Sequence, residues 1–212
     1  MLSKSSVAAQ YRAALGIHGN SPAAVFWPKG RQDLRFEALT RHLPPSGFSL
    51  LDYGCGLAHL KPFLDARFEN FTYTGVDMVG EFLALDREKY TDAHFIELDD
   101  PRLLTFECDH IVLSGVFNML YSTDVDTHKK QVWETIETLY SLARDSLAVN
   151  FMTNKVDFRQ VGAFHLDPCE LVDFIRTRLS CRFVIDQSYM PYEYTAVIWK
   201  NIHVKRPELV FI

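Results

Sequence analysis

Short apolar segments and helical periodicities alternate along most of this sequence. Runs rich in Leu, Ile, Val and Phe predict five strands, at residues 49–53, 71–77, 94–98, 109–113 and 147–151. Apolar residues spaced by three and four predict helices at residues 58–67, 81–90, 127–142 and 168–179. The order of these segments predicts five β/α units, and therefore an α/β domain with a mainly parallel sheet.

The pattern changes near the C-terminal end. Residues 181–186 and 194–199 predict two more strands, with only a loop that contains Pro191 between them. Two strands without an intervening helix indicate an antiparallel pair that closes the sheet. Before this pair, residues 153–167 predict a long polar loop, and Asp167 and Pro168 suit the cap and the first position of the next helix.

The first 47 residues have a different character. Residues 7–15 and 32–43 predict two helices, separated by a loop at residues 21–30 that contains two prolines and the aromatic pair Phe26 and Trp27. A segment of this length is too short to bury a core of its own. We expect residues 1–47 to form a helical cap or lid on a single domain whose main part spans residues 48–212.

Composition narrows the class of protein. A chain of 212 residues suits one domain with a sizeable core, and a net charge of −5 argues against general nucleic-acid binding. No apolar run approaches the roughly 20 residues that a membrane span needs, and the start lacks the apolar segment of a secretory signal. The four cysteines form no C-x-x-C pair, so neither a zinc site nor a dithiol motif is expected. We expect reduced thiols, a cytoplasmic location and no metal.

The first predicted strand leads into a glycine-rich turn. Residues 49–58 read S-L-L-D-Y-G-C-G-L-A, so an acid and two glycines, Gly54 and Gly56, lie between strand and helix. This arrangement is how an α/β protein builds a nucleotide pocket. A dinucleotide fingerprint needs a third glycine, but His59 occupies that position. An NAD(P)-dependent oxidoreductase is therefore the weaker alternative.

Acidic residues follow three of the predicted strands. Asp52 ends the first strand, Asp77 ends the second, and Asp99 and Asp100 follow the third. The carboxyl ends of parallel strands meet at one edge of the sheet, where such sheets bind ligands. An acid at the place of Asp77 can accept hydrogen bonds from both ribose hydroxyls, and Asp99 is placed to accept one from an exocyclic amine.

This ordered set resembles the class I S-adenosylmethionine-dependent methyltransferases. The resemblance rests on L-L-D-Y-G-C-G-L-A, on T-G-V-D, on E-L-D-D, on D-H-I-V-L-S-G-V-F-N and on the closing strand pair, and covers about residues 48–200. It implies a Rossmann-like, mainly parallel sheet of seven strands with an antiparallel last strand and helices on both faces. It also implies a methyltransferase with S-adenosylmethionine as its cofactor.

The resemblance also implies roles for individual residues. Asp52, Gly54 and Gly56 would line the methionine end of the cofactor, and Asp77 would hold the ribose. Met78 would lie against the adenine, and Asp99 (or Asp100) would accept from its amine. Ser114, Gly115 and Val116 would border the methyl group. We expect Arg35, or alternatively Arg31, to bind the carboxylate of the cofactor, because a guanidinium matches a carboxylate in shape and charge.

The acceptor is harder to predict. Methyl transfer is an in-line displacement, so the protein mainly positions a nucleophile. The N-P-P-[FYW] motif of many DNA and protein amine methyltransferases is absent after the fourth strand, and we expect a small-molecule acceptor. Its expected wall residues are Trp27, Asn118, Tyr121 and Tyr192, and His165 is the best candidate for a general base. A macromolecular substrate and a non-catalytic nucleotide-binding protein stay open as alternatives.

Overall fold

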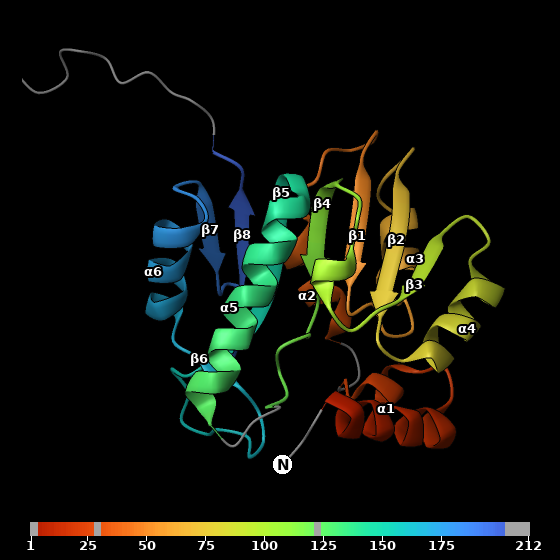
Figure 1. Cartoon of the computed structure of the whole chain (residues 1–212), viewed down its shortest axis with the longest axis horizontal. Coiled ribbons are helices and arrows are strands. Elements are labelled where there is room, and N and C mark those ends of the chain that lie inside the picture. Colours follow the sequence, from red (N-terminus) through yellow and green to blue (C-terminus); the bar gives the residue numbers. More distant parts are fainter. Residues whose placement is uncertain (1–3, 28–30, 121–123, 202–212) are drawn as a thin grey trace, which may run out of the picture.

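The fold is described by a computed structural model that covers residues 4–27, 31–120 and 124–201. Its centre is a single sheet in the order β3-β2-β1-β4-β5-β8-β7 (Figure 1). The strands are β1 (Ser49–Tyr53), β2 (Thr72–Asp77), β3 (His94–Glu97), β4 (Cys108–Leu113), β5 (Ala143–Thr153), β7 (Phe183–Asp186) and β8 (Glu193–Trp199). β8 is antiparallel to both of its neighbours, β5 and β7, and the other pairs are parallel. The predicted Rossmann-like sheet with an antiparallel last strand is confirmed.

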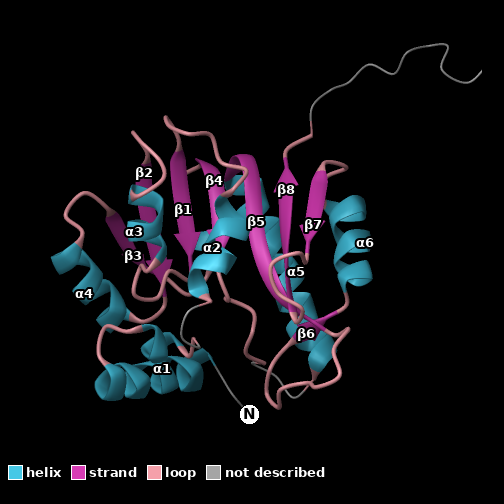
Figure 2. Ribbon diagram, turned by 180° about the vertical axis from the view of Figure 1, so that it is seen from behind, coloured by secondary structure: helices cyan, strands magenta, loops and turns pink. Residues whose placement is uncertain are grey.

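Helices cover both faces of this sheet, as predicted (Figures 1 and 2). The helices are α1 (Lys4–His18), α2 (Gln32–Thr40), α3 (Leu60–Asp65), α4 (Gly80–Lys89), α5 (Val125–Leu142) and α6 (Pro168–Arg178), with 3-10 turns η1 (Pro22–Val25) and η2 (Pro101–Leu103). Side chains of β1 alternate between two cores because successive residues of a strand point to opposite faces. Leu51 belongs to the core shared with α5 and α6, and Leu50 belongs to the core shared with α2, α3 and α4.

Two parts of the predicted element order are wrong in detail. β3 is followed by the short turn η2 and not by an α-helix, because Pro101 opens the turn and Asp100 accepts a hydrogen bond from the amide of Arg102 at 3.0 Å. The long loop before α6 contains an eighth strand, β6 (His165–Leu166), which pairs with the end of β5. The predicted start of α6 is confirmed, since Asp167 accepts from the amide of Cys169 at 2.9 Å.

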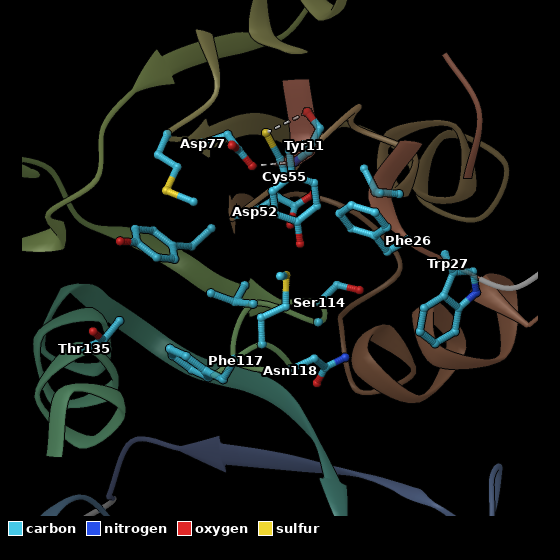
Figure 3. A pocket seen from close by; sticks show the side chains of 18 of the residues that line it. Tyr11, Phe26, Trp27, Asp52, Cys55, Asp77, Ser114, Phe117, Asn118 and Thr135 are labelled. Carbon is cyan, nitrogen blue, oxygen red and sulfur yellow. Dashed lines mark hydrogen bonds between the residues drawn. The ribbon is translucent and has the colours of Figure 1, made fainter. Parts of the chain in front are cut away.

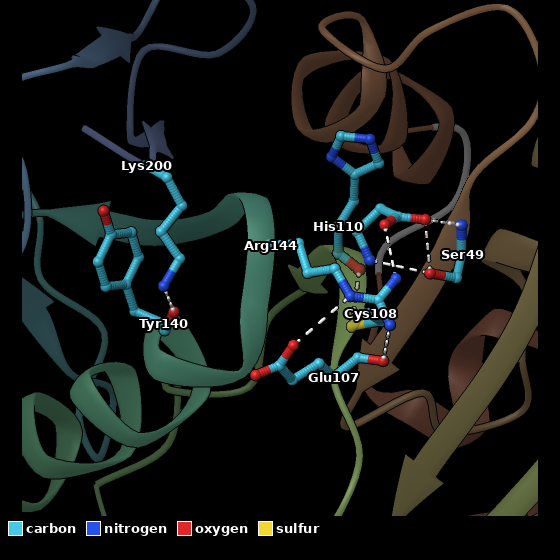
Figure 4. Close-up of polar contacts among 8 residues, drawn as sticks. Ser49, Glu107, Cys108, His110, Tyr140, Arg144 and Lys200 are labelled. Carbon is cyan, nitrogen blue, oxygen red and sulfur yellow. Dashed lines mark hydrogen bonds and ion pairs between the residues drawn. The ribbon is translucent and has the colours of Figure 1, made fainter. Parts of the chain in front are cut away.

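Polar contacts hold together the edge of the sheet where the parallel strands begin (Figure 4). The amide and hydroxyl of Ser49 donate to Oδ2 of Asp109 at 2.8 and 2.7 Å, and Arg144 donates to the other oxygen at 3.0 Å. Lys200, just after β8, donates to the carbonyl of Tyr140 in α5. These contacts connect β1, β4 and β5 and join the end of β8 to α5 at one edge, and they leave the opposite edge to the candidate site.

The N-terminal segment lies over that opposite edge. Arg12 of α1 donates to Glu81 of α4 at 2.7 Å, and the ring of Tyr11 contacts Phe26 and Phe82 at centroid distances of 5.1 and 5.9 Å. These contacts fix α1 and η1 beside the carboxyl ends of the parallel strands. No helix among the described residues is long and apolar enough to span a membrane.

Candidate active site

A cavity of about 810 Å³ opens at the carboxyl ends of β1, β2 and β4. Its walls come from the glycine turn, from the loop after β4, from the N-terminal segment and from the start of β8. Figure 3 shows Asp52, Cys55 and Asp77 together on one wall, and Trp27, Phe117 and Asn118 elsewhere around the space. Pockets for small organic ligands have volumes of about 300–1,000 Å³, so the cavity has room for a ligand of nucleotide size.

The glycine turn is bound tightly to β2. The amides of Gly54 and Cys55 both donate to the carbonyl of Val76, at 2.7 and 3.0 Å. Gly54 has φ of +75° and Gly56 has φ of +57°, a region that glycine enters far more easily than other residues. A Cβ on Gly54 would lie 2.7 Å from Cγ2 of Val116, in the loop after β4. Glycine is therefore needed here both for the backbone conformation and for the approach of a second loop.

Asp77 fixes the geometry of this turn. Its Oδ2 accepts a hydrogen bond from the amide of Gly56 at 2.8 Å, and its Oδ1 accepts one from the amide of Val79 at 2.9 Å. A carboxylate oxygen can accept more than one hydrogen bond. The side chain can therefore orient the turn and also receive a hydroxyl of a ligand in the cavity.

Asp52 is the most deeply buried of the predicted cofactor residues. Its side chain is 2% exposed, Oδ2 accepts from the hydroxyl of Tyr73 at 2.6 Å, and Oδ1 has no hydrogen-bond partner among the described residues. Burial raises the pKa of Asp52 to about 7, although the bond from Tyr73 opposes this shift. Burial also raises the pKa of Asp77.

A third carboxylate, Asp86 of α4, lies behind this wall and was not anticipated from the sequence. It is fully buried, and neither of its oxygens has a hydrogen-bond partner among the described residues. Burial and the nearby charges of Asp77 and Asp52 raise the pKa of Asp86 to about 7. The acidic end of the cavity wall therefore contains the buried Asp52 and the half-buried Asp77, with the buried Asp86 behind them, an environment that favours a positively charged ligand.

The shifted pKa of Asp86 has a consequence for stability. Since the pKa is about 7 in the folded chain against an ordinary value of 3.8, the folded state loses stability as the pH rises between these values. Asp86→Asn removes the charge, so we expect the variant to be more stable than the wild type by roughly 1–3 kcal/mol above about pH 7. The gain should shrink toward about pH 4, where the wild-type carboxyl is protonated.

Urea unfolding of both proteins without ligand, repeated across this pH range, measures the effect. A variant that is less stable than the wild type at about pH 8 would contradict the expected sign.

The opposite end of the cavity contains a buried ion pair. Arg35 of α2 is 4% exposed, and it donates through Nε and Nη2 to the two oxygens of Glu193, at 2.6 and 2.5 Å. The guanidinium carbon lies 3.4 Å from the centre of the Trp27 ring, and Tyr189 donates to Glu193 at 3.1 Å. Glu193 binds Nε and Nη2 of Arg35 and does not bind Nη1. If Arg35 binds the carboxylate of the cofactor as predicted, it must therefore use Nη1. That nitrogen lies beside Gly115, where a Cβ would come within 2.8 Å of it.

Glu193 is a site residue that was not predicted from the sequence, although the sequence contains a signal for it. β8 is antiparallel to β5, so its first residue falls at the edge where the parallel strands end. An acid at the first position of the closing strand could have been placed in the site by this argument. Asn150 of β5 lies at the same edge, and its Oδ1 accepts a hydrogen bond from the amide of Gly115 at 2.7 Å.

Most of the predicted site residues line this one cavity: Trp27, Arg35, Asp52, Gly54, Gly56, Asp77, Met78, Asp99, Ser114, Asn118 and Tyr192. Asp100 also lines it, but its carboxylate is bound to Arg102 at 2.6 Å. Arg31 lies at the same end as Tyr192 and donates to its hydroxyl. Tyr121 lies outside the described residues. The roles of these residues stay predictions, but the structure brings them to one place.

The structure places His165, the predicted general base, apart from the other predicted site residues. His165 is in β6 and is not part of the cavity wall. Its Nδ1 lies 2.9 Å from the carbonyl of Thr153, and its Nε2 accepts from the amide of Gln160 at 3.3 Å. Both ring nitrogens therefore hold the loop between β5 and β6, and neither is directed at a substrate.

In the part of the chain that the structure describes, no group of three or more His, Cys, Asp or Glu side chains could hold a metal ion. The donor set of the cavity does fit an adenosyl ligand with a sulfonium group. Acids occur at the ends of neighbouring strands, and Oδ1 of Asp52 lacks a partner among the described side chains. A positive charge at this end would offset the repulsion between the buried carboxylates.

A comparison of this sequence with curated proteins finds a methyltransferase. The chain is 31% identical over 159 residues to "Putative methyltransferase Rv1506c" of Mycobacterium tuberculosis, and the match covers 72% of this chain and 93% of that protein. No family model matches the chain.

Solved structures share the fold at low sequence identity. A TehB-like SAM-dependent methyltransferase from Corynebacterium glutamicum is similar with a TM-score of 0.58 and 11% identity, over 92% of this chain and 99% of that chain. Magnesium protoporphyrin IX methyltransferase from Synechocystis PCC 6803, solved with bound SAM, gives a TM-score of 0.57 and 16% identity, over 78% of this chain and 76% of that chain.

Proposed function

This chain belongs to the class I S-adenosylmethionine-dependent methyltransferases, and we propose that it methylates an N, O or S atom of a small molecule. Its cofactor is S-adenosylmethionine, which supplies an electrophilic methyl group when bound. The observation that carries the small-molecule proposal is the group of aromatic and polar side chains in the cavity wall. Phe26 and Trp27 of the N-terminal segment, together with Asn118 and Tyr192, line the cavity. Aromatic walls with a few polar groups are typical of small-molecule pockets.

We propose that the acidic end binds the cofactor. Asp77 would accept the ribose hydroxyls while its bonds to the amides of Gly56 and Val79 keep it in position. Asp52, Gly54 and Gly56 would border the methionine part, Met78 and Asp99 the adenine, and Ser114 the methyl group. Nη1 of Arg35 would reach the carboxylate of the cofactor.

The contribution of the protein to the reaction would be positioning and the exclusion of water. The described part of residues 1–47 would supply a cap, and its side chains Tyr11, Phe26 and Trp27 line the cavity. A general base is needed only where the attacking atom must lose a proton. His165 lies outside the cavity wall, and a nucleophile that attacks without prior deprotonation, such as a thioether or a free amine, would need no base.

Calorimetric titration with S-adenosylhomocysteine tests cofactor binding. Asp77→Ala should weaken binding by about 1.5–3 kcal/mol, the contribution of a hydrogen bond to a charged group. Asp173→Ala is the matched control, because Asp173 is an exposed acid on α6 outside the cavity. Unchanged affinity of a folded Asp77→Ala variant would remove this residue from its role.

The size class of the acceptor can be tested directly. The protein is incubated with methyl-labelled S-adenosylmethionine and a cell extract that has been separated by ultrafiltration into small molecules and macromolecules. We expect labelled product in the small-molecule fraction. Label that is transferred only to protein or nucleic acid would favour the macromolecular alternative, and cofactor binding without any transfer would favour a non-catalytic protein.

A further inference from the structure

We propose that Asp52, Asp77 and Asp86 together make this site favour a positively charged ligand over its neutral counterpart, and that Asp86 contributes without touching the ligand. The inference rests on the proposed function, because the charged ligand is S-adenosylmethionine and the neutral one is the product, S-adenosylhomocysteine. The two differ by one methyl group and by the positive charge on sulfur. Such a preference would help the site to release product and to take up new cofactor.

The first argument is the state of Asp86. Carboxylates that are fully buried are normally paired or hydrogen-bonded, because an isolated buried charge is unfavourable. Asp86 is 0% exposed, forms no ion pair within the described part of the chain, and both of its oxygens lack a hydrogen-bond partner there. The residue lowers the stability of the fold, and nothing in its packing compensates for this cost. Residues of this kind are most often kept for function.

The second argument is the surroundings of Asp86. The titratable groups that act on it or face it from neighbouring elements are Asp52 of β1, Tyr73 and Asp77 of β2, Cys55 of the glycine turn, and Arg87 and Lys89 of α4 itself. Both of these cations are exposed side chains. The groups of the neighbouring elements are thus acids, a thiol and a phenol. The buried Arg and Lys side chains of the described residues, Arg35 and Lys61, are paired with other carboxylates, those of Glu193, Asp65 and Asp92.

The third argument connects this cluster to the cavity. Asp52 and Asp77 line the cavity, whereas Asp86 lies behind them and is not part of its wall. Charge interactions in a protein interior act beyond contact distance. Two unit charges about 10 Å apart, at an effective dielectric constant of about 20, change an affinity by roughly tenfold. Asp86 can therefore influence a sulfonium in the cavity without a hydrogen bond to it.

The cluster also predicts a dependence on pH. The pKa values of Asp52 and Asp86 are both raised by burial to about 7. Asp52 and Asp86 are therefore largely neutral below this pH and gain negative charge above it. Preference for the charged ligand should increase as the pH rises through neutrality. The amino-acid part is common to both ligands, so its own titration cancels in the ratio of their affinities.

Calorimetric titrations with both ligands, at about pH 6 and about pH 8, test the proposal. In the wild type, the ratio of the Kd for S-adenosylhomocysteine to the Kd for S-adenosylmethionine should be higher at the upper pH. Asp86→Asn should lower this ratio about three- to tenfold at the upper pH. The control is Glu88→Gln, which removes an exposed acid from the same helix and should leave the ratio unchanged.

A second measurement separates an electrostatic role from a merely structural one. Titrations near pH 7 in buffers with different ionisation enthalpies report the protons released on binding. The wild type should release more protons with S-adenosylmethionine than with S-adenosylhomocysteine, and Asp86→Asn should reduce the difference.

Equal ratios at both pH values, with equal proton release for the two ligands, would overturn the proposal even if Asp86→Asn failed to fold. A folded protein that binds neither ligand would instead contradict the proposed function.

Discussion

Replacing Glu193 with alanine is expected to lower the free energy of unfolding by about 3–5 kcal/mol, because it leaves a buried guanidinium without its carboxylate. Arg35 and Glu193 are 4% and 1% exposed, and two hydrogen bonds join them. Removing one partner of such a pair leaves a charge that water cannot reach. The loss also affects Tyr189, whose hydroxyl donates to the same carboxylate.

Chemical denaturation of the ligand-free protein measures this effect. The control is Glu81→Ala, which breaks the pair with Arg12, whose two side chains are 46% and 51% exposed; it should change stability by less than about 1 kcal/mol. A double replacement, Arg35→Met with Glu193→Leu, should recover most of the lost stability, because both charges are removed. A loss for Glu193→Ala no larger than that of the control would show that Arg35 finds another partner or reaches water.

Gly54→Ala is expected to weaken binding of S-adenosylhomocysteine at least about hundredfold. An L-residue at a φ of +75° is strained by about 1–2 kcal/mol. In addition, the new methyl carbon would lie 2.7 Å from Cγ2 of Val116. Either the glycine turn or the loop after β4 must then move, and both line the cavity.

Gly47→Ala is a close control for this experiment. Gly47 has φ of +77°, but a Cβ on it would meet nothing within 4 Å. This variant should lose about 1 kcal/mol of stability and keep the affinity of the wild type. Adding Val116→Ala to Gly54→Ala removes the colliding carbon and should recover part of the binding. If the double variant binds no better than Gly54→Ala alone, the collision with Val116 is not the cause.

The strand-end acids illustrate what the sequence could predict. Asp52 and Asp77 follow apolar runs of strand length, and parallel strands place such residues at one edge of the sheet. Local pattern and topology therefore lead to the same place, and the cavity contains both. The glycine turn and the antiparallel closing strand were predicted from the sequence in the same way, from local pattern and topology.

The residues that were missed or wrongly assigned depend on contacts that no local pattern encodes. Asp86 occurs in the polar run L-D-R-E-K of a helix, and only the packing of α4 against β2 determines that it is buried. The two nitrogens of His165 contact the carbonyl of Thr153 and the amide of Gln160, and the sequence gives no sign of either contact. The partner of Glu193 can be identified only when the position of β8 in the sheet is known.

The ion pair between Arg35 and Glu193 also constrains the order in which the chain can fold. Its members are 158 positions apart, and β8, which carries Glu193, lies between β5 and β7 in the sheet. An intermediate that lacks β8 would have to leave the guanidinium of α2 hydrated. Helix α2 can therefore dock fully only after the closing strand has been inserted, which makes assembly of the site a late event dominated by long-range contacts.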